Sequence, residues 1–198
     1  MKLHTILAGA ALALATSIAG AASAQELVVN GGFETGDFSG WSSGGGNYVN
    51  PADSCYSGAC AHSGAFGVSF GAVGGESPLS QVIATHAGDA YTISFWLNSI
   101  GSMGDSVSLS WDGNLLFSQS NIPAEGWVQH TFTATASTDS TVLSLGLRND
   151  PSWDGLDDIS VTDASGGVPE PATWAMMLTG FVGAGAALRG RRRMALAA

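Results

Sequence analysis

Alternating apolar and polar positions dominate the middle of the chain and predict β-strands. Tyr91, Ile93, Phe95 and Leu97 alternate with polar residues and with Trp96. Because successive side chains of a strand point to opposite faces, these four should line a core and Trp96 should face outward. The same pattern predicts short strands at 26–30, 66–70, 79–85, 107–111, 115–118, 128–136, 142–148 and 156–162. With no helical periodicity between them, they predict an all-β fold, a jelly-roll-like antiparallel β-sandwich.

The N-terminal end has the three parts of a secretory signal. Lys2 supplies the positive start, residues 6–18 form an apolar run, and Ala22-Ser23-Ala24 is a small-residue cleavage box. A membrane-spanning helix needs about 20 apolar residues, which is more than this run provides. Residues 1–24 are therefore predicted to be a signal peptide, cleaved between Ala24 and Gln25.

The C-terminal end predicts a membrane anchor. After a linker at 165–168 and the triplet Pro169-Glu170-Pro171, residues 172–188 are uncharged, and arginines follow at 189 and 191–193. The uncharged run is at the lower limit of length for a transmembrane helix, and membrane helices tolerate its glycines. The arginines should stay cytoplasmic and leave the preceding chain outside. The alternative, a buried C-terminal helix of the globular domain, does not explain the arginines.

Residues 169–193 together resemble the PEP-CTERM sorting domain, in the variant in which Trp174-Ala175-Met176-Met177 follows the Pro-Glu-Pro motif. The resemblance implies recognition by an exosortase, a membrane transpeptidase, with cleavage near Pro169, Glu170 and Pro171. It also implies a Gram-negative bacterium that makes extracellular polysaccharide. The protein would be held in the membrane by its tail helix before processing, and would then reach the cell surface or the extracellular matrix.

The predicted domain between these ends, residues 25–164, is strongly acidic. It holds 15 of the 16 acids, all but Glu170, and Arg148 is its single Lys or Arg, so its net charge is 1 − 15 = −14. Such a charge disfavours nucleic acid and anionic membrane surfaces as partners. Neutral, basic or cation-bridged ligands fit better, and clustered carboxylates suit calcium.

Two segments of the domain resemble galactose-binding-like carbohydrate-binding modules. Leu27-Val-Val-Asn-Gly-Gly-Phe-Glu34 resembles their opening, and residues 149–161 resemble their last loop and last strand. The resemblance implies a structural calcium held by Glu34 and by Asp157 or Asp158, with backbone carbonyls. Because Asp157 and Asp158 are neighbours on a predicted strand, only one of the two side chains should reach such a site. The alternative is turn chemistry, in which the aspartates of this loop accept hydrogen bonds from backbone amides.

Cys55 and Cys60 are the only cysteines of the chain. An even pair in an exported protein usually forms a disulfide, which here would close a small loop. The alternative is a metal site, for which only His62 is near in sequence. The pair therefore predicts a disulfide.

Aromatic residues in loops or on an outer sheet face are the candidates for a sugar platform, because sugar C–H groups stack on flat apolar rings. Trp96 is out of phase with the core residues of its strand, and Tyr48, Tyr56 and Trp153 lie in Gly- and Ser-rich loops. Arg148 could hold a hydroxyl or a carboxylate as a bidentate fork, or could pair with a neighbouring acid.

Sequence motifs of enzymes are missing from the domain. It has no Ser elbow, HExxH zinc motif or Gly-rich phosphate loop, and its histidines show no metal-ligand spacing. We therefore expect a non-catalytic domain that binds polysaccharide, with the exopolysaccharide of the same cell as the first ligand to test. The alternative is a structural biofilm-matrix protein or adhesin that uses the same sandwich and binds no sugar.

Overall fold

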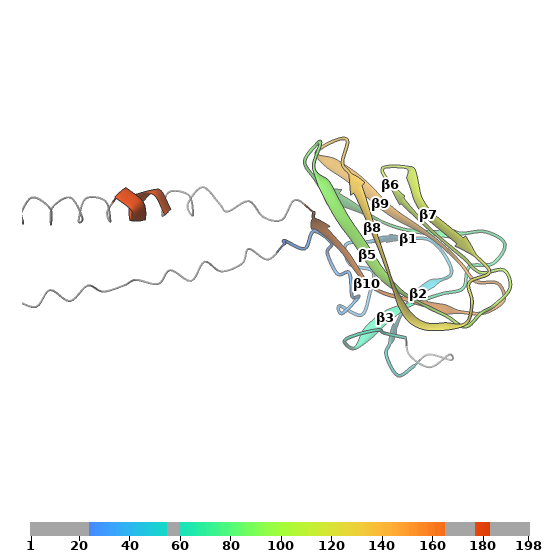
Figure 1. Cartoon of the computed structure of the whole chain (residues 1–198). Coiled ribbons are helices and arrows are strands. Elements are labelled where there is room, and N and C mark those ends of the chain that lie inside the picture. The colour runs from blue at the N-terminus through green and yellow to red at the C-terminus, as the bar shows by residue number, and fades with distance from the viewer. Residues whose placement is uncertain (1–23, 55–59, 165–176, 183–198) are drawn as a thin grey trace, which may run out of the picture.

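The computed structural model describes residues 24–54, 60–164 and 177–182, and the folded part consists almost entirely of β-strands (Figure 1). Ten strands are present in these ranges, and they run in sequence order. They are β1 (Ser42–Ser43), β2 (Asn47–Pro51), β3 (Phe66–Phe70), β4 (Ser77–Ala84), β5 (Ala90–Ser99), β6 (Ser106–Trp111), β7 (Asn114–Ser120), β8 (Glu125–Thr135), β9 (Ser140–Arg148) and β10 (Asp154–Asp163).

The strands form two five-stranded sheets in which every pairing is antiparallel. One sheet has the order β1-β4-β9-β6-β7 and the other the order β2-β3-β10-β5-β8. Most neighbours within a sheet are distant in sequence; β10, the last strand, lies between β3 and β5. The predicted all-β antiparallel sandwich is therefore confirmed.

The first segment of the domain differs from its prediction as a strand. Residues 26–30 make only an isolated bridge, from Glu26 to Thr162. At Asn30 the backbone turns into the left-handed region with a φ of 55°, and its carbonyl accepts a hydrogen bond from Trp41 Nε1 at 3.1 Å. The apolar residues that suggested a strand here instead anchor a turn. Conversely, the short polar strands β1 and β2 carry no alternation by which the sequence could have predicted them.

The core lies between the sheets and follows the predicted alternation along β5. Tyr91, Ile93, Phe95 and Leu97 are each 2% exposed or less, whereas Trp96 lies on the opposite face of the strand. Facing side chains from β6 and β9 complete this layer, since Leu109, Leu145 and others there are fully buried. The remaining large, fully buried side chains are Phe33, Phe70, Leu79, Ile83, Leu143, Leu147 and Leu156.

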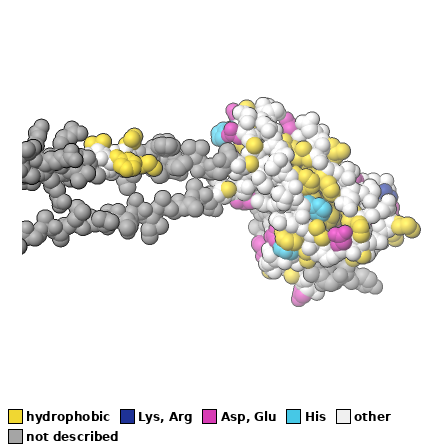
Figure 2. All heavy atoms as spheres, viewed as in Figure 1, with side chains coloured by type: hydrophobic (Ala, Val, Ile, Leu, Met, Phe, Trp, Pro, Cys, Tyr) yellow, Lys and Arg dark blue, Asp and Glu magenta, His cyan; other side chains and the backbone are white. Residues whose placement is uncertain are grey.

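One side of the sandwich, where β7 and β8 form the sheet edges, is closed by aromatic side chains. Phe95 stacks on His130 and Phe132 at centroid distances of 5.2 and 6.1 Å, and Phe117 of β7 lies 5.2 Å from both of these rings. Burial lowers the pKa of His130. A band of hydrophobic side chains lies over β8 in the same view (Figure 2). His130 is thus a half-buried packing residue at this edge of the sandwich.

Both ends of the chain lie largely beyond the described ranges. Of the signal-peptide prediction, only Ala24 and Gln25 are described, and both are exposed. The triplet Pro169-Glu170-Pro171 lies outside the described residues, as does most of the predicted 172–188 helix, of which 177–182 is helical. Within the described part of the chain, no helix has the length and apolar character needed to cross a membrane.

Candidate functional site

Tyr48 of β2 and Trp153, which precedes β10, form an exposed aromatic pair. Their ring centroids are 5.4 Å apart at an interplanar angle of 64°, and the residues are 54% and 39% exposed. Tyr48 is paired across the sheet with Ser69 of β3, which is paired with Gly155 of β10, so the fold brings segments a hundred residues apart into contact. Two of the predicted sugar-binding residues therefore lie side by side on the surface.

Gly71 lies beneath the Trp153 ring. A Cβ atom at this position would lie 2.7 Å from Trp153 Cε3, so the indole lies directly against the backbone. The amide of Gly71 donates to the carbonyl of Gly46 at 2.8 Å, which ties the chain before Tyr48 to the chain after β3. Any larger side chain in place of Gly71 would displace Trp153 from this position.

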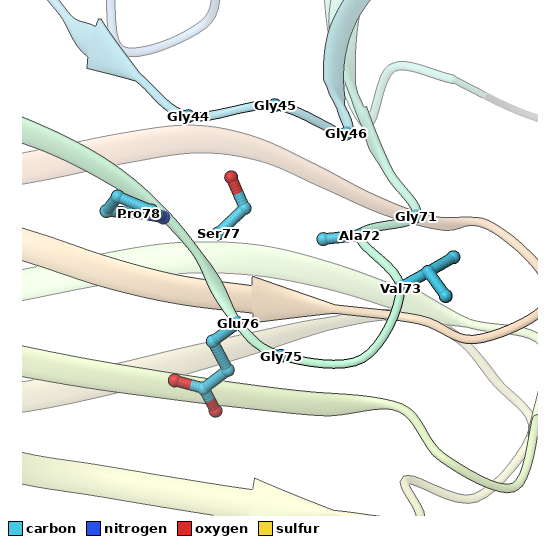
Figure 3. Close-up of a pocket in the computed structure, with 10 residues that line it drawn as sticks. All are labelled: Gly44, Gly45, Gly46, Gly71, Ala72, Val73, Gly75, Glu76, Ser77 and Pro78. Atoms are coloured by element: carbon cyan, nitrogen blue, oxygen red, sulfur yellow. The ribbon is translucent and has the colours of Figure 1, made fainter.

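Gly71 also lines a shallow hollow of about 570 Å³ between the β1–β2 and β3–β4 connections (Figure 3). Its walls are mostly backbone, from the runs 44–46 and 71–73 and from Gly75, with Pro78 beside them. Ser77 points toward the 44–46 run, whereas Glu76 points away from it (Figure 3). Glu76 instead accepts hydrogen bonds from Ser106 and Ser108 on the outer face of the other sheet, at 2.9 and 2.6 Å. The hollow therefore presents small polar groups beside the aromatic pair.

Arg148 lies at the same end of the sandwich, at the C-terminus of β9. Its Nη2 is 3.5 Å from Asp150 Oδ2, and the same carboxylate oxygen accepts a hydrogen bond from Gly74 N at 3.2 Å. The predicted neighbouring acid is thus its partner, and Asp150 links the 149–153 loop to the edge of the hollow.

Trp96 faces outward as predicted, but its ring is not open to solvent on both sides. His62 stacks on it with a centroid distance of 3.7 Å and an angle of 12°. Trp127 lies edge-on to His62 at 5.7 Å, and a Cβ at Gly155 would lie 2.9 Å from the Trp127 ring. Trp96 therefore belongs to a packed cluster with His62 and Trp127.

Asp157 and Asp158 both reach the loop that carries His62, although strict alternation predicts that their side chains point to opposite faces. A bulge interrupts β10 between Asp157 and Ser160, and Asp158 has a φ of 48°. The Asp157 carboxylate accepts hydrogen bonds from the amides of His62 and Ser63 at 2.7 and 3.1 Å. Asp158 lies 2.7 Å from His62 Nδ1 and accepts a hydrogen bond from the Ser63 hydroxyl at 2.9 Å. The bulge breaks the strict alternation on which the prediction depended.

Glu34 holds the following part of the same loop. Its carboxylate accepts hydrogen bonds from the amides of Ala65 and Phe66, at 2.9 to 3.1 Å. A Cβ at Gly32 would lie 3.2 Å from Asp158 Oδ1, 3.8 Å from Glu34 Cγ and 3.9 Å from Asp157 Oδ1. The three residues named for calcium thus surround one glycine, and each carboxylate binds the 62–66 loop.

The carboxylates of Glu34, Asp157 and Asp158 supply the hard oxygen atoms that calcium binds. In residues 24–54, 60–164 and 177–182, however, no group of three His, Cys, Asp or Glu side chains is arranged around one point as a metal centre would need. Calcium at Glu34, Asp157 and Asp158 therefore stays a prediction.

Burial raises the pKa of two carboxyl groups in this region. The pKa of Asp157 is raised from 3.8 to about 6 by burial, against the amide hydrogen bonds that it accepts. Burial also raises the pKa of Asp154 from 3.8 to about 6, and the nearby Asp105 carboxylate adds to the rise. Each group is thus harder to ionise in the folded protein than in the unfolded chain.

We expect stability to fall with pH because of these groups. A pKa that is raised on folding gives stability that is complete below pH 3.8 and is lost as the pH rises toward about 6. At 1.36 kcal/mol per unit, each buried group should lower the free energy of unfolding by about 3 kcal/mol over this window. Urea unfolding at pH 4 and pH 7, in chelator, measures the change. Asp154→Asn should remove about half of this change in the free energy of unfolding, whereas Asp53→Asn, at an exposed position, should leave it unaltered. An equal pH dependence in the unchanged protein and both variants would contradict the expectation.

Two of the named residues, Tyr56 and Cys55, lie outside the described residues. Cys60 is fully buried, and its Sγ lies 3.9 Å from the hydroxyl oxygens of Ser54 and Ser69. The disulfide between Cys55 and Cys60 stays a prediction.

The outer face of the other sheet has a different character. Paired positions place Ser42, Ser80, Ser144 and Ser110 in one row across β1, β4, β9 and β6. This row of short hydroxyl side chains offers no ring on which a sugar could stack.

His62 and Trp127, which the sequence did not identify as candidates for the sugar site, lie on the β2-β3-β10-β5-β8 sheet. No local sequence pattern marks these two residues as neighbours, because His62 reaches this sheet only through the connection between β2 and β3.

Sequence comparison and structure comparison give different results for this chain. No protein-family model matches it, and no curated protein matches it. A structure of TmCBM61 in complex with beta-1,4-galactotriose is similar, with a TM-score of 0.54 and 23% identity over 70% of this chain and 99% of that chain. The family 22 carbohydrate-binding module of Clostridium thermocellum Xyn10B has a TM-score of 0.52 and 12% identity, over 73% of this chain and 94% of that chain. The K1 cleaved adhesin domain of Lys-gingipain from Porphyromonas gingivalis has a TM-score of 0.54 and 15% identity, over 67% of this chain and 95% of that chain. At these identities the likeness shows the fold: this chain has the β-sandwich fold of carbohydrate-binding modules.

Proposed function

We propose that this protein is an exported, non-catalytic carbohydrate-binding protein whose ligand stacks on Tyr48 and Trp153. The observation that carries the proposal is the exposure of two aromatic rings, 5.4 Å apart, beside a hollow walled mostly by glycine backbone. Sugar rings present apolar C–H faces to such rings, and the surrounding backbone groups can hydrogen-bond their hydroxyls. The fold shared with carbohydrate-binding modules supports the same conclusion.

The negative charge of the domain disfavours anionic polysaccharides as ligands. Acidic side chains are spread over the visible face, whereas basic ones are nearly absent from it (Figure 2). Arg148, the only Lys or Arg in the described ranges, is engaged by Asp150. Anionic polymers would meet like charge almost everywhere on such a surface. The ligand we propose is therefore a neutral or basic polysaccharide, such as an uncharged exopolysaccharide.

Affinity electrophoresis tests this proposal directly. The purified protein is run through gels that contain neutral, amino-sugar or acidic polysaccharides, including that of the host. Retardation by a neutral or basic polymer is the expected result. Free migration through every gel would overturn sugar binding for the polymers tested and favour a structural matrix protein or adhesin.

Export and sorting form the second part of the proposal. The signal peptide at 1–24 and the tail at 169–193 would deliver the domain to the cell surface or matrix through an exosortase. Intact mass spectrometry of the mature protein from an exosortase-containing host should show loss of the segment after Pro169-Glu170-Pro171. The same protein from a strain without the exosortase should keep its tail, and an identical mass in both strains would contradict this part.

Calcium at Glu34, Asp157 and Asp158 is the third part. Bound calcium would offset the repulsion between the three carboxylates, and a ligand that binds only the folded state stabilises the domain. We expect the melting temperature to rise when calcium is added after chelation, and Glu34→Gln to lose one bound calcium per chain. Equal calcium content in Glu34→Gln and the unchanged protein would place the ion elsewhere.

A further inference from the structure

A second pair of carboxylates is buried near the start of β10, before the bulge. Asp105, before β6, and Asp154, at the start of β10, are each 1% exposed. Asp105 accepts hydrogen bonds from the Ile122 amide at 2.9 Å and from the Ser99 hydroxyl at 3.2 Å. Asp154 accepts one bond, from the Ile100 amide at 3.0 Å, through Oδ1. Neither acid took part in the predicted calcium site or the sugar site.

The pair is close enough to interact. The Asp105 charge and burial both raise the pKa of Asp154, and Ser99 interacts with both carboxyl groups. Both acids therefore lie in one small volume at the C-terminal end of β5, where Ser99 contacts Asp105 and the neighbouring Ile100 amide contacts Asp154.

Polar atoms in this volume lack partners. Asn149 is fully buried, and neither its Oδ1 nor its Nδ2 has a hydrogen-bond partner among the described residues. Asp154 Oδ2 is likewise without one. The Asn149 side chain lowers the pKa of Asp154, so its amide N–H faces that carboxyl group, although too far away for a regular hydrogen bond. Two acceptor oxygens, one from each side chain, are thus buried and unused.

Neither acid forms an ion pair with a positive side chain in the described part of the chain. Arg148 is the only Lys or Arg there, and its recorded ion pair is with Asp150. Buried charges in proteins are paired, or else they coordinate metals, because a lone buried charge is strongly unfavourable. Two carboxylates with unused amide and carboxylate oxygens are therefore missing a cation.

We propose that Asp105, Asp154 and Asn149 bind one calcium-class divalent cation. Carboxylate, amide and hydroxyl oxygens are the hard ligands that calcium takes in irregular geometry. Magnesium gives up its water reluctantly and fits a site this dry less well. The site is separate from the three carboxylates around Gly32, and it does not depend on sugar binding. Two of its ligands, Asn149 and Asp154, are the ends of the 149–154 segment, which also carries Trp153.

Calcium counting tests the proposal on the purified protein. After chelation, calcium chloride is titrated by isothermal calorimetry at pH 7.5, and bound metal is measured by elemental analysis. Asp154→Asn should bind one calcium fewer per chain than the unchanged protein, while Asp53→Asn, an exposed control, should bind the same number. In chelator, Asp154→Asn should melt at a higher temperature than the unchanged protein, because it removes an uncompensated charge.

A second variant keeps the test decisive. Asn149→Asp adds a third carboxylate, so it should tighten calcium binding at this site at least tenfold and lower the melting temperature in chelator. If Asp154→Asn melts higher but calcium content is unchanged in both variants, the pair shares a proton and the proposal fails. Loss of calcium in Glu34→Gln only, with Asp154→Asn unaffected, would likewise overturn it, whatever the outcome for sugar binding.

Discussion

Replacing Trp153 with alanine is expected to abolish most of the polysaccharide binding of this protein. Trp153 is 39% exposed, its ring lies edge-on to the Tyr48 ring, and it packs against the backbone of Gly71. A stacked aromatic residue at the centre of a binding site contributes about 2 kcal/mol or more, which corresponds to a loss on the order of 30-fold in affinity. Tyr48→Ala should have a smaller effect in the same direction, and the double variant should bind no measurable sugar.

Dissociation constants from affinity electrophoresis, at several polymer concentrations, measure this effect. Leu115→Ala is the matched control, because Leu115 is 66% exposed and apolar but lies on the other sheet. Trp96→Ala is the informative comparison: with His62 stacked on its ring, Trp96 should affect stability more than affinity. If Trp96→Ala removes binding while Trp153→Ala does not, the sugar lies at the His62–Trp96–Trp127 cluster and our placement of the site is wrong.

Phe33→Ala is expected to destabilise the domain by about 3 to 5 kcal/mol, the usual loss for removing a buried phenylalanine. Phe33 has no exposed surface, and its ring lies 6.0 Å from Phe38 and 5.8 Å from Trp41. It also has a φ of 56°, so alanine keeps the strained backbone and loses the packing. The loss should be large enough to leave a fraction of the protein unfolded near body temperature.

Urea unfolding followed by tryptophan fluorescence measures the change in the free energy of unfolding. Val29→Ala, in the same segment and 61% exposed, should change it by less than about 0.5 kcal/mol. Phe33→Leu, which keeps most of the volume, should fall between the two. A Phe33→Ala variant as stable as the unchanged protein would mean that the opening segment does not pack as the structure shows.

The candidate sites show how far local pattern carries a prediction. Tyr48 and Trp153 were identified as aromatic residues in expected loops, and Arg148 as the single cation of the domain. The structure places Tyr48 in strand β2 instead of a loop, and all three residues lie at one end of the sandwich. Their proximity was not predictable, because it depends on β10 lying between β3 and β5. Trp96 was placed correctly on its outer face, yet only the 52–65 connection brings His62 onto it.

The acidic residues show where local sequence pattern fails to predict the site. The opposed faces predicted for Asp157 and Asp158 follow from ideal alternation, and one bulge overrides it. Asp105 and Asp154 carry no local signal of their burial together, since they are 49 positions apart in the printed sequence. The charge count indicated an excess of carboxylates, but it did not indicate which of them would be buried.

The sequence by itself determined the class of this fold, the export and sorting signals that we propose, and the choice of aromatic candidates. These depend on short-range periodicity and composition, which any segment displays without its neighbours. Tertiary structure alone decided which rings meet, which acids are buried and which loops cover the sheet. Each of these depends on pairing between distant strands, where one bulge or one connection redirects several side chains at once.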